Sequence, residues 1–167
     1  MLKAILATDQ MGSIGYKYDL PWPKNEFDLA WFHNNTLGCD VICGRKTWDG
    51  LHSDVKERFG TAYVVTRDYL HKTGAYQDIA CDVETLKRDR VQAMRNSDKT
   101  TWVIGGKQIY DELIPLCQEI YITTIPGVYR ADTFMDIDAL RESLIPDKGY
   151  LMPDQSWVDI YKRNKES

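Results

Sequence analysis

The sequence predicts an α/β domain built on a largely parallel central sheet, and three observations carry that prediction. Short apolar runs of strand length alternate with helical stretches along the chain. The chain's 167 residues, of which 43% are hydrophobic and 28% charged, suffice for one domain with a sizeable core. Residues 157–161 alternate apolar and polar side chains, with no helix after them. We therefore expect one domain over 1–167, with a mixed, mostly parallel sheet flanked by helices and an antiparallel C-terminal edge.

Strands are predicted where a short run of apolar, often β-branched residues is bounded by polar ones. The runs that fit lie at 2–7, 41–43, 63–65, 102–104 and 120–122. Helices are predicted where apolar residues recur every three or four positions. These stretches lie at 26–37, 47–51, 83–95 and 107–116.

Charge and cysteine content exclude several classes of protein. A net charge of −4 removes the attraction behind non-specific binding to nucleic acid or an anionic membrane, so we expect neither partner. An anionic ligand then needs a local basic cluster. Cys39, Cys43, Cys81 and Cys117 show no metal-ligand spacing, which predicts reduced thiols and no metal. The sequence shows no signal-peptide pattern and no apolar run of membrane-spanning length, so we expect a cytoplasmic protein.

Asp28 is the candidate catalytic residue that the pattern singles out. It falls in the first turn of the helix predicted over 26–37, on the face that carries Trp31 and Phe32. A carboxylate on an apolar face is unfavourable without a partner, and it suits hydrogen bonding to a ring amide and handling one proton. The alternative is structural, because Asn25 and Asp28 also have the spacing of an N-cap followed by an acidic residue three positions later.

Three further features suit a ligand that carries its own chemistry. Residues 9–24 form a long, turn-rich segment of the kind that serves as a lid or binding loop. Glycines follow two predicted strands, within 41–47 and 103–107, where backbone can approach a ligand and the next helix offers N–H groups to an anion. The sequence contains no HExxH, EF-hand or P-loop motif and no pattern of a hydrolytic triad.

Five motifs resemble, in order and spacing, those of the dihydrofolate reductase family. They are Ile14-Gly15 with Leu20-Pro21-Trp22, Asp28-Leu29-Ala30-Trp31-Phe32 with Thr36, Gly44-Arg45-Lys46-Thr47-Trp48, Val103-Ile104-Gly105-Gly106 with Tyr110, and Tyr121-Ile122-Thr123 with Ala131-Asp132-Thr133-Phe134. The resemblance implies a single-domain enzyme of one-carbon metabolism that uses NADPH to reduce 7,8-dihydrofolate to tetrahydrofolate. It also implies antifolate binding, and we expect a monomer.

The resemblance implies roles for individual residues. Asp28 would hold the pterin and favour protonation at N5 before hydride reaches C6, Trp22 would hold a water, and Thr123 would hydrogen-bond Asp28. Substrate contacts are implied for Ala7, Asp28, Leu29, Phe32, Leu51, Arg58, Ile104 and Tyr110. Cofactor contacts are implied for Ala7, Ile14, Gly15, Leu20, Gly44, Arg45, Lys46, Thr47, Thr66, Arg67, Gly105, Gly106, Lys107, Gln108 and Tyr110, with Arg45 and Arg67 on the 2′-phosphate.

The sequence also departs from the family pattern. Leu20 stands where the family usually has methionine, and Ala131 stands where glycine usually precedes the aspartate that braces the lid. Gly60 falls at the place of the arginine that binds the substrate's glutamate tail, which leaves Arg58 as the candidate anchor. Two alternatives stay open at this point: a pyrimidine reductase of riboflavin synthesis, and a non-catalytic protein that retains the fold.

Overall fold

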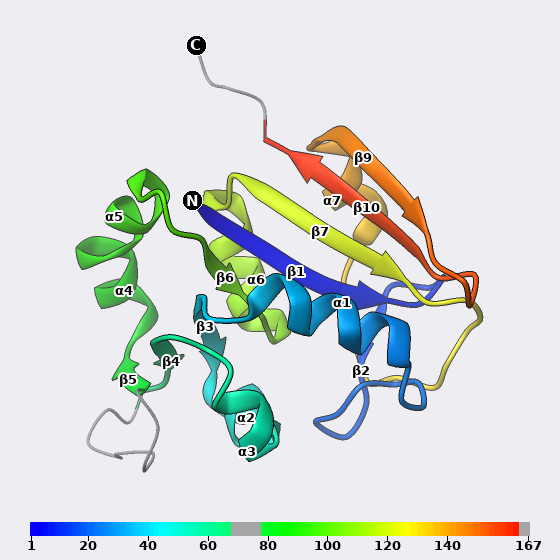
Figure 1. Cartoon of the computed structure of the whole chain (residues 1–167), viewed down its shortest axis with the longest axis horizontal. Coiled ribbons are helices and arrows are strands. Elements are labelled where there is room, and N and C mark those ends of the chain that lie inside the picture. The colour runs from blue at the N-terminus through cyan, green and yellow to red at the C-terminus, as the bar shows by residue number, and fades with distance from the viewer. Residues whose placement is uncertain (68–77, 164–167) are drawn as a thin grey trace.

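The computed structural model describes residues 1–67 and 78–163, and it shows one central sheet with helices on both faces (Figure 1). Within these residues the sheet has eight strands in the order β5-β4-β3-β6-β1-β7-β10-β9. Their bounds are β1 Leu2–Thr8, β3 Asp40–Gly44, β4 Ala62–Val65, β5 Asp78–Cys81, β6 Thr101–Val103, β7 Glu119–Thr124, β9 Ile145–Leu151 and β10 Trp157–Lys162. The predicted α/β class is confirmed.

Strand directions also follow the prediction. β1 pairs with β6 and β7 in parallel, and β3, β4 and β5 continue the parallel part beyond β6. β10 runs antiparallel to both β7 and β9, so the antiparallel C-terminal edge is confirmed. The sequence alone predicts no strand at β9, because Pro146 and Gly149 interrupt it and every one of its residues is exposed.

The helices are α1 Glu26–Thr36, α2 Arg45–Gly50, α3 Ser53–Lys56, α4 Val83–Asp89, α5 Val91–Asn96, α6 Lys107–Leu113 and α7 Ile137–Glu142. The single helix predicted over 83–95 is wrong, because the backbone leaves the helical region at Arg90 (φ −128°, ψ −31°) and separates α4 from α5. The helix predicted over 107–116 is too long. It ends at Leu113 and gives way to a 3₁₀ turn (η1, Ile114–Leu116), because Pro115 has no N–H to continue an α-helix.

The hydrophobic core lies on both faces of the sheet, as the period of two along each strand requires. On β6, for example, Val103 belongs to one cluster while its neighbour Trp102 belongs to the other. The first cluster includes buried residues of α4, α5, α6 and α7, and the second packs against α1, α2 and α3. The three N-terminal helices therefore cover one face of the sheet and the later four the opposite face.

The segment 9–24 is more ordered than a structureless loop. It contains a short strand, β2 (Ser13–Gly15), which pairs with β8 (Thr133–Phe134) in a separate two-stranded sheet. At its start, the buried Asp9 carboxylate accepts hydrogen bonds from the backbone N–H groups of Met11, Ser13 and Tyr129 at 2.9–3.0 Å. Among the described residues, no helix combines the length and apolar character that a membrane crossing requires.

Candidate active site

Asp28 lies where the first turn of α1 faces the carboxyl ends of β1 and β7. The Asn25 side chain caps α1 by accepting a hydrogen bond from the Asp28 backbone N–H at 2.9 Å. The Asp28 carboxylate instead accepts a hydrogen bond from the Thr123 hydroxyl. The Asp28 backbone therefore takes part in the N-cap, as the structural alternative expects. The Asp28 side chain does not, because it is directed to the site.

The surroundings of Asp28 make its carboxyl a weaker acid than usual. Burial raises its pKa, the Thr123 hydrogen bond lowers it and the nearby Asp154 carboxylate raises it, which together place it at about 6. Tyr110 is near enough for the Asp28 charge to raise the pKa of its phenol further, beyond the larger effect of its own burial. A carboxyl with this pKa exchanges its proton close to neutral pH, as acid–base chemistry requires.

Several of the predicted apolar wall residues lie on the same face of the sheet as this carboxylate. Phe32, Leu51 and Ile104 pack in the same cluster on the α1 face of the sheet. Ala7 lies directly opposite Thr123 in the parallel register of β1 and β7. Leu29 is half-buried on α1. The structure thus brings the apolar residues of α1, β1 and the segment after β6 to the same side as Asp28.

Trp22 is 5% exposed, and its ring meets that of Tyr129 edge-on with centroids 6.2 Å apart. Its indole N–H is buried and has no hydrogen-bond acceptor among the described residues. A buried donor of this kind suits a bound water or ligand group. Tyr129, which fixes the Trp22 ring, carries no signal in the sequence because the two residues lie in segments far apart along the chain.

The two glycine corners predicted to bind phosphate lie side by side. The Gly44 N–H donates a hydrogen bond to the Gly105 carbonyl at 2.8 Å, which joins the ends of β3 and β6. A Cβ atom on Gly106 would lie 3.4 Å from the Thr47 hydroxyl oxygen, and one on Gly105 would crowd the Tyr110 ring at 3.1 Å. Neither α2 nor α6 has a side-chain N-cap, so both helices present N–H groups at this junction.

Basic residues begin both helices at that junction, Arg45 and Lys46 in α2 and Lys107 in α6, as an anionic ligand on an acidic protein requires. The Arg45 Nε atom lies 3.0 Å from an Asp49 oxygen, and the Lys107 Nζ atom lies 2.6 Å from an Asp111 oxygen. Lys46 lies over the Tyr18 ring, 4.6 Å from its centroid, and thereby joins α2 to the 9–24 segment. Arg67 is exposed, and Gln108 is exposed on α6. Thr66 donates its N–H to the Cys81 carbonyl at the end of β5.

The 9–24 segment is held from a distant part of the chain. The Lys17 N–H donates a hydrogen bond to the Asp132 carboxylate at 2.8 Å, and the Asp132 N–H donates one to the Gly15 carbonyl at 3.0 Å. Ile14 is half-buried beside the core, whereas Leu20 is exposed. The contact predicted between the 9–24 segment and Asp132 is therefore present.

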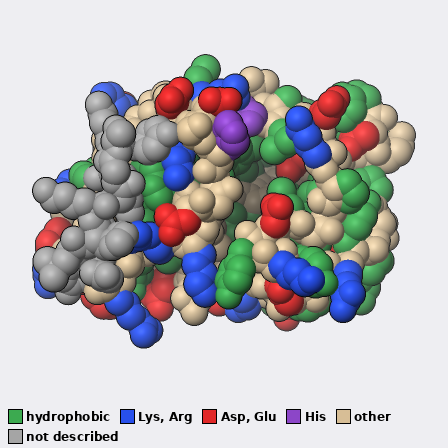
Figure 2. Space-filling model, turned by 90° about the horizontal axis from the view of Figure 1, so that it is seen from below, with side chains coloured by type: hydrophobic (Ala, Val, Ile, Leu, Met, Phe, Trp, Pro, Cys, Tyr) green, Lys and Arg blue, Asp and Glu red, His purple; other side chains and the backbone are tan. Residues whose placement is uncertain are grey.

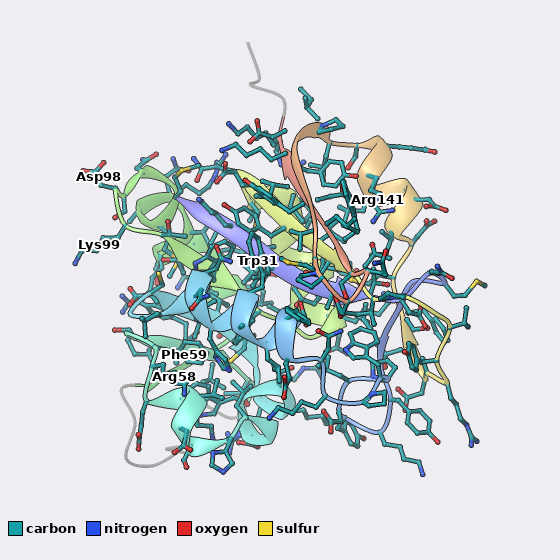
Figure 3. All side chains as sticks on the ribbon, turned by 45° about the vertical axis from the view of Figure 1, so that its right-hand side comes forward. Trp31, Arg58, Phe59, Asp98, Lys99 and Arg141 are labelled. Atoms are coloured by element: carbon teal, nitrogen blue, oxygen red, sulfur yellow. The ribbon has the colours of Figure 1, made fainter. Side chains whose placement is uncertain are left out.

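The candidate anchor for a substrate tail lies after α3 (Figure 3). Arg58 is exposed there, while Phe59 points inward and meets the Phe32 ring edge-on at 6.2 Å. A Cβ on Gly60 would lie 2.6 Å from an oxygen of Asp40, whose carboxylate accepts the Thr61 N–H. Position 60 is closed to a long side chain unless Asp40 moves.

One cavity formed by the described residues lies away from this site. It measures about 590 Å³ and lies between α4–α5 and α6–η1, crossed by the Lys87–Glu112 ion pair. No residue that lines it belongs to the predicted site. The face that carries α2, α3 and the 9–24 segment is instead hollowed near its middle (Figure 2). Among the described residues, no group of three or more potential metal ligands occurs.

These features define an α/β protein of one domain, in which a partly buried carboxylate lies beside two glycine corners able to receive an anionic cofactor. The sequence model of the family "Dihydrofolate reductase" matches residues 1–143. A dihydrofolate reductase of Mycoplasma pneumoniae is 31% identical over 138 residues, covering 83% of this chain and 84% of that protein. The type 8 enzyme of Escherichia coli is 33% identical over 138 residues, covering 81% and 80%. The chain belongs to the dihydrofolate reductase family.

A solved structure agrees with this assignment over the whole chain. The dihydrofolate reductase of Enterococcus faecalis, complexed with NADP(H) and RAB-propyl, superposes with a TM-score of 0.77 at 25% identity. The match covers 99% of this chain and 97% of that one. It therefore includes the C-terminal strands β9 and β10, which lie beyond the segment matched by the family model.

Proposed function

We propose that this protein reduces 7,8-dihydrofolate to 5,6,7,8-tetrahydrofolate with NADPH. The observation that carries the proposal is the Asp28 carboxyl, which is held by Thr123 and has a pKa raised to about 6. Relatives named dihydrofolate reductase and a structural neighbour that holds NADP(H) support the same activity. We further propose a cytoplasmic monomer that antifolates inhibit at this site.

Asp28 is proposed both to orient the substrate and to manage its proton. In its ionised form the carboxylate accepts hydrogen bonds from the pterin's 2-amino and N3 groups. A carboxyl with a pKa of 6 is protonated in about one molecule in ten at pH 7, which favours proton delivery toward N5. Thr123 fixes the carboxylate through its hydroxyl, and the buried Trp22 N–H is proposed to hold a water near the ring. Phe32, Leu51 and Ile104 exclude bulk water from one side.

NADPH, when bound, supplies the hydride that reaches C6. The residues present fit its anionic parts, because two uncapped helix N-termini meet at the Gly44–Gly105 hydrogen bond. We propose that the backbone at 44–47 and 105–106 holds the pyrophosphate, with Arg45 and Arg67 on the 2′-phosphate. Arginine suits that last task because its planar donors bind phosphate in pairs.

The experiment that tests the proposal is an assay of NADPH absorbance with dihydrofolate, with and without an antifolate. We expect turnover that the antifolate abolishes, and Asp28→Asn should fold but lose about 10²- to 10⁴-fold in turnover at neutral pH. Near-normal activity of Asp28→Asn would remove Asp28 from the mechanism. Asp138→Asn, an exposed carboxylate on α7, is the matched control.

The pyrimidine precursor of riboflavin synthesis serves as the competing substrate in the same assay. A pyrimidine reductase would account for the fold and the cofactor corners, but it does not explain Trp22 and Asp28 together. Turnover of that precursor in place of dihydrofolate would favour the alternative, and no turnover of either substrate would favour a non-catalytic protein.

A further inference from the structure

A second carboxylate, Asp154, lies close to Asp28 although it comes from the turn between β9 and β10. The Asn25 amide nitrogen donates a hydrogen bond to an Asp154 oxygen at 2.6 Å, across 129 residues of sequence. The oxygen of the same Asn25 amide accepts the Asp28 backbone N–H at 2.9 Å. One side chain therefore connects Asp154 to the turn of α1 that carries Asp28.

The turn around Asp154 is built to keep that carboxylate in place. The backbone N–H of Ser156 donates to one Asp154 oxygen at 3.0 Å, and the Ser156 hydroxyl donates to the other at 2.9 Å. Ser156 is fully buried, and the turn is closed by a hydrogen bond of 2.8 Å from the Met152 N–H to the Ser156 carbonyl. β10 begins directly after the turn and places Val158 opposite Thr123, the partner of Asp28.

Asp154 is ionised at neutral pH. Burial raises its pKa, but the hydrogen bonds from Ser156 and Asn25 outweigh that effect and hold the pKa below its usual value. Its negative charge therefore faces Asp28 from the β9–β10 turn. The Thr123 hydroxyl on β7 also acts on Asp28 by donating a hydrogen bond to it, and the Tyr110 phenol on α6 is close enough for the Asp28 charge to raise its pKa.

We propose that Asp154 is a positioning residue for Asp28, which it reaches through the Asn25 side chain and through the charge that it places beside the site. This inference rests on the proposed function. The Asn25 link holds the first turn of α1 against the β9–β10 turn, so the Asp28 carboxylate keeps one orientation toward a flat substrate. The negative charge of Asp154 disfavours ionisation of a second carboxyl nearby, so Asp28 retains its proton to higher pH.

The charge is tested by Asp154→Asn, which keeps the shape of the side chain and removes its charge. Carbon-13 NMR of labelled aspartate carboxyls, with Asp28 assigned from its loss in Asp28→Asn, reports the Asp28 titration without any turnover. We expect its midpoint to move to lower pH by about half a pH unit or more. The pH profile of kcat/KM should move in parallel, lowering the rate at pH 7 about threefold.

Two variants complete the test. Asp154→Glu retains the charge and should restore the midpoint. Asp147→Asn, which removes a charge from the same hairpin where it pairs with Lys162, should leave the midpoint unchanged. A midpoint in Asp154→Asn equal to that of the unmodified protein overturns the role of the charge. Because this titration needs no substrate, its failure is distinct from failure of the proposed activity.

The link is tested by Asn25→Ser, because serine still caps a helix but cannot reach Asp154. Thermal unfolding checks that the fold is intact. We expect kcat/KM for dihydrofolate to fall severalfold even at low pH, where Asp28 is protonated in all variants, while the Asp28 midpoint changes less than in Asp154→Asn. Unchanged kcat/KM at low pH in a folded Asn25→Ser overturns the link.

Discussion

Arg58 contributes a positive charge beside the end of α1. Burial lowers the pKa of His33 on that helix, and the Arg58 charge lowers it further, so the two side chains are close enough to interact. Arg58 is exposed and its neighbour Phe59 is turned inward, which leaves the Arg58 guanidinium accessible to an anionic group (Figure 3). Position 60 is enclosed by Asp40 and Gly38, so it has no room for a side chain that could bind such an anionic group.

We predict that Arg58→Ala raises KM for dihydrofolate about tenfold, because one charge-assisted contact to the substrate's glutamate carboxylate is lost. The kcat at saturating substrate should change little, since the tail is remote from the reacting atoms. Steady-state kinetics measure both parameters. The control is Arg88→Ala on α4, whose guanidinium pairs with Asp89 at the surface. Equal KM values in the two variants would show that the tail binds elsewhere.

Single residues of the site differ in how far the sequence predicts them. Asp28 could be found because a carboxylate on an apolar helix face is unusual, and the glycine corners could be found because they follow strands directly. The pairing of Asn25 with Asp154 could not, because no local pattern links residues that lie on α1 and in the β9–β10 turn. For the same reason the edge-on contact of Trp22 with Tyr129 has no signal in the sequence.

At the scale of elements, the 9–24 segment owes its order to β8 and Asp132. Lys17 and Tyr18 both have left-handed backbone conformations, with φ of 49° and 65°, which non-glycine residues rarely adopt without support. That support comes from the Asp132 carboxylate, which accepts the Lys17 N–H. Lys46, stacked on the Tyr18 ring, ties the same tip to the helix α2 proposed to bind the cofactor.

We predict that Asp132→Ala slows hydride transfer roughly 2- to 10-fold, because the 9–24 segment loses the hydrogen bond from the Lys17 N–H to a charged acceptor. Stopped-flow absorbance of NADPH in a single turnover measures the step directly. The midpoint of the Asp28 titration should not change, because the bracing role proposed for Asp132 concerns only the 9–24 segment. Asp138→Ala, which removes an exposed carboxylate from α7, is the control. A hydride-transfer rate equal to that of the control would contradict a bracing role.

The sequence predicts the elements that are buried and periodic and misses those that depend on neighbours. β1, β3, β4, β6 and β7 each carry an apolar run, so periodicity finds them. β9 has none, because it is an exposed edge strand ordered by its hydrogen bonds to β10. The break at Arg90 occurs without proline or glycine, and tertiary packing of α4 and α5 overrides their helical pattern there.

At the scale of the whole molecule, the Asp28 carboxyl links activity to stability. Its pKa is about 6 in the folded protein, against an ordinary value of 3.8, so the folded state binds the proton more tightly than the unfolded state. Stability therefore falls as pH rises from about 4 through 6, and above that range the ionised carboxylate destabilises the fold. This pKa difference of about two units corresponds to a loss of roughly 3 kcal/mol in the free energy of unfolding.

We predict that Asp28→Asn is more stable than the unmodified protein at pH 8, by up to about 3 kcal/mol or several degrees in Tm. The neutral amide carries no buried charge and still accepts the Thr123 hydrogen bond. The difference should shrink as pH falls toward 4, where Asp28 is protonated in the folded protein as well. Calorimetry at pH 8 and pH 5 measures it, with Asp138→Asn as the control. A difference in Tm that is the same at both pH values would refute the raised pKa of Asp28. If Asp28→Asn is instead more stable and less active than the unmodified protein, the fold retains this carboxylate for its chemistry.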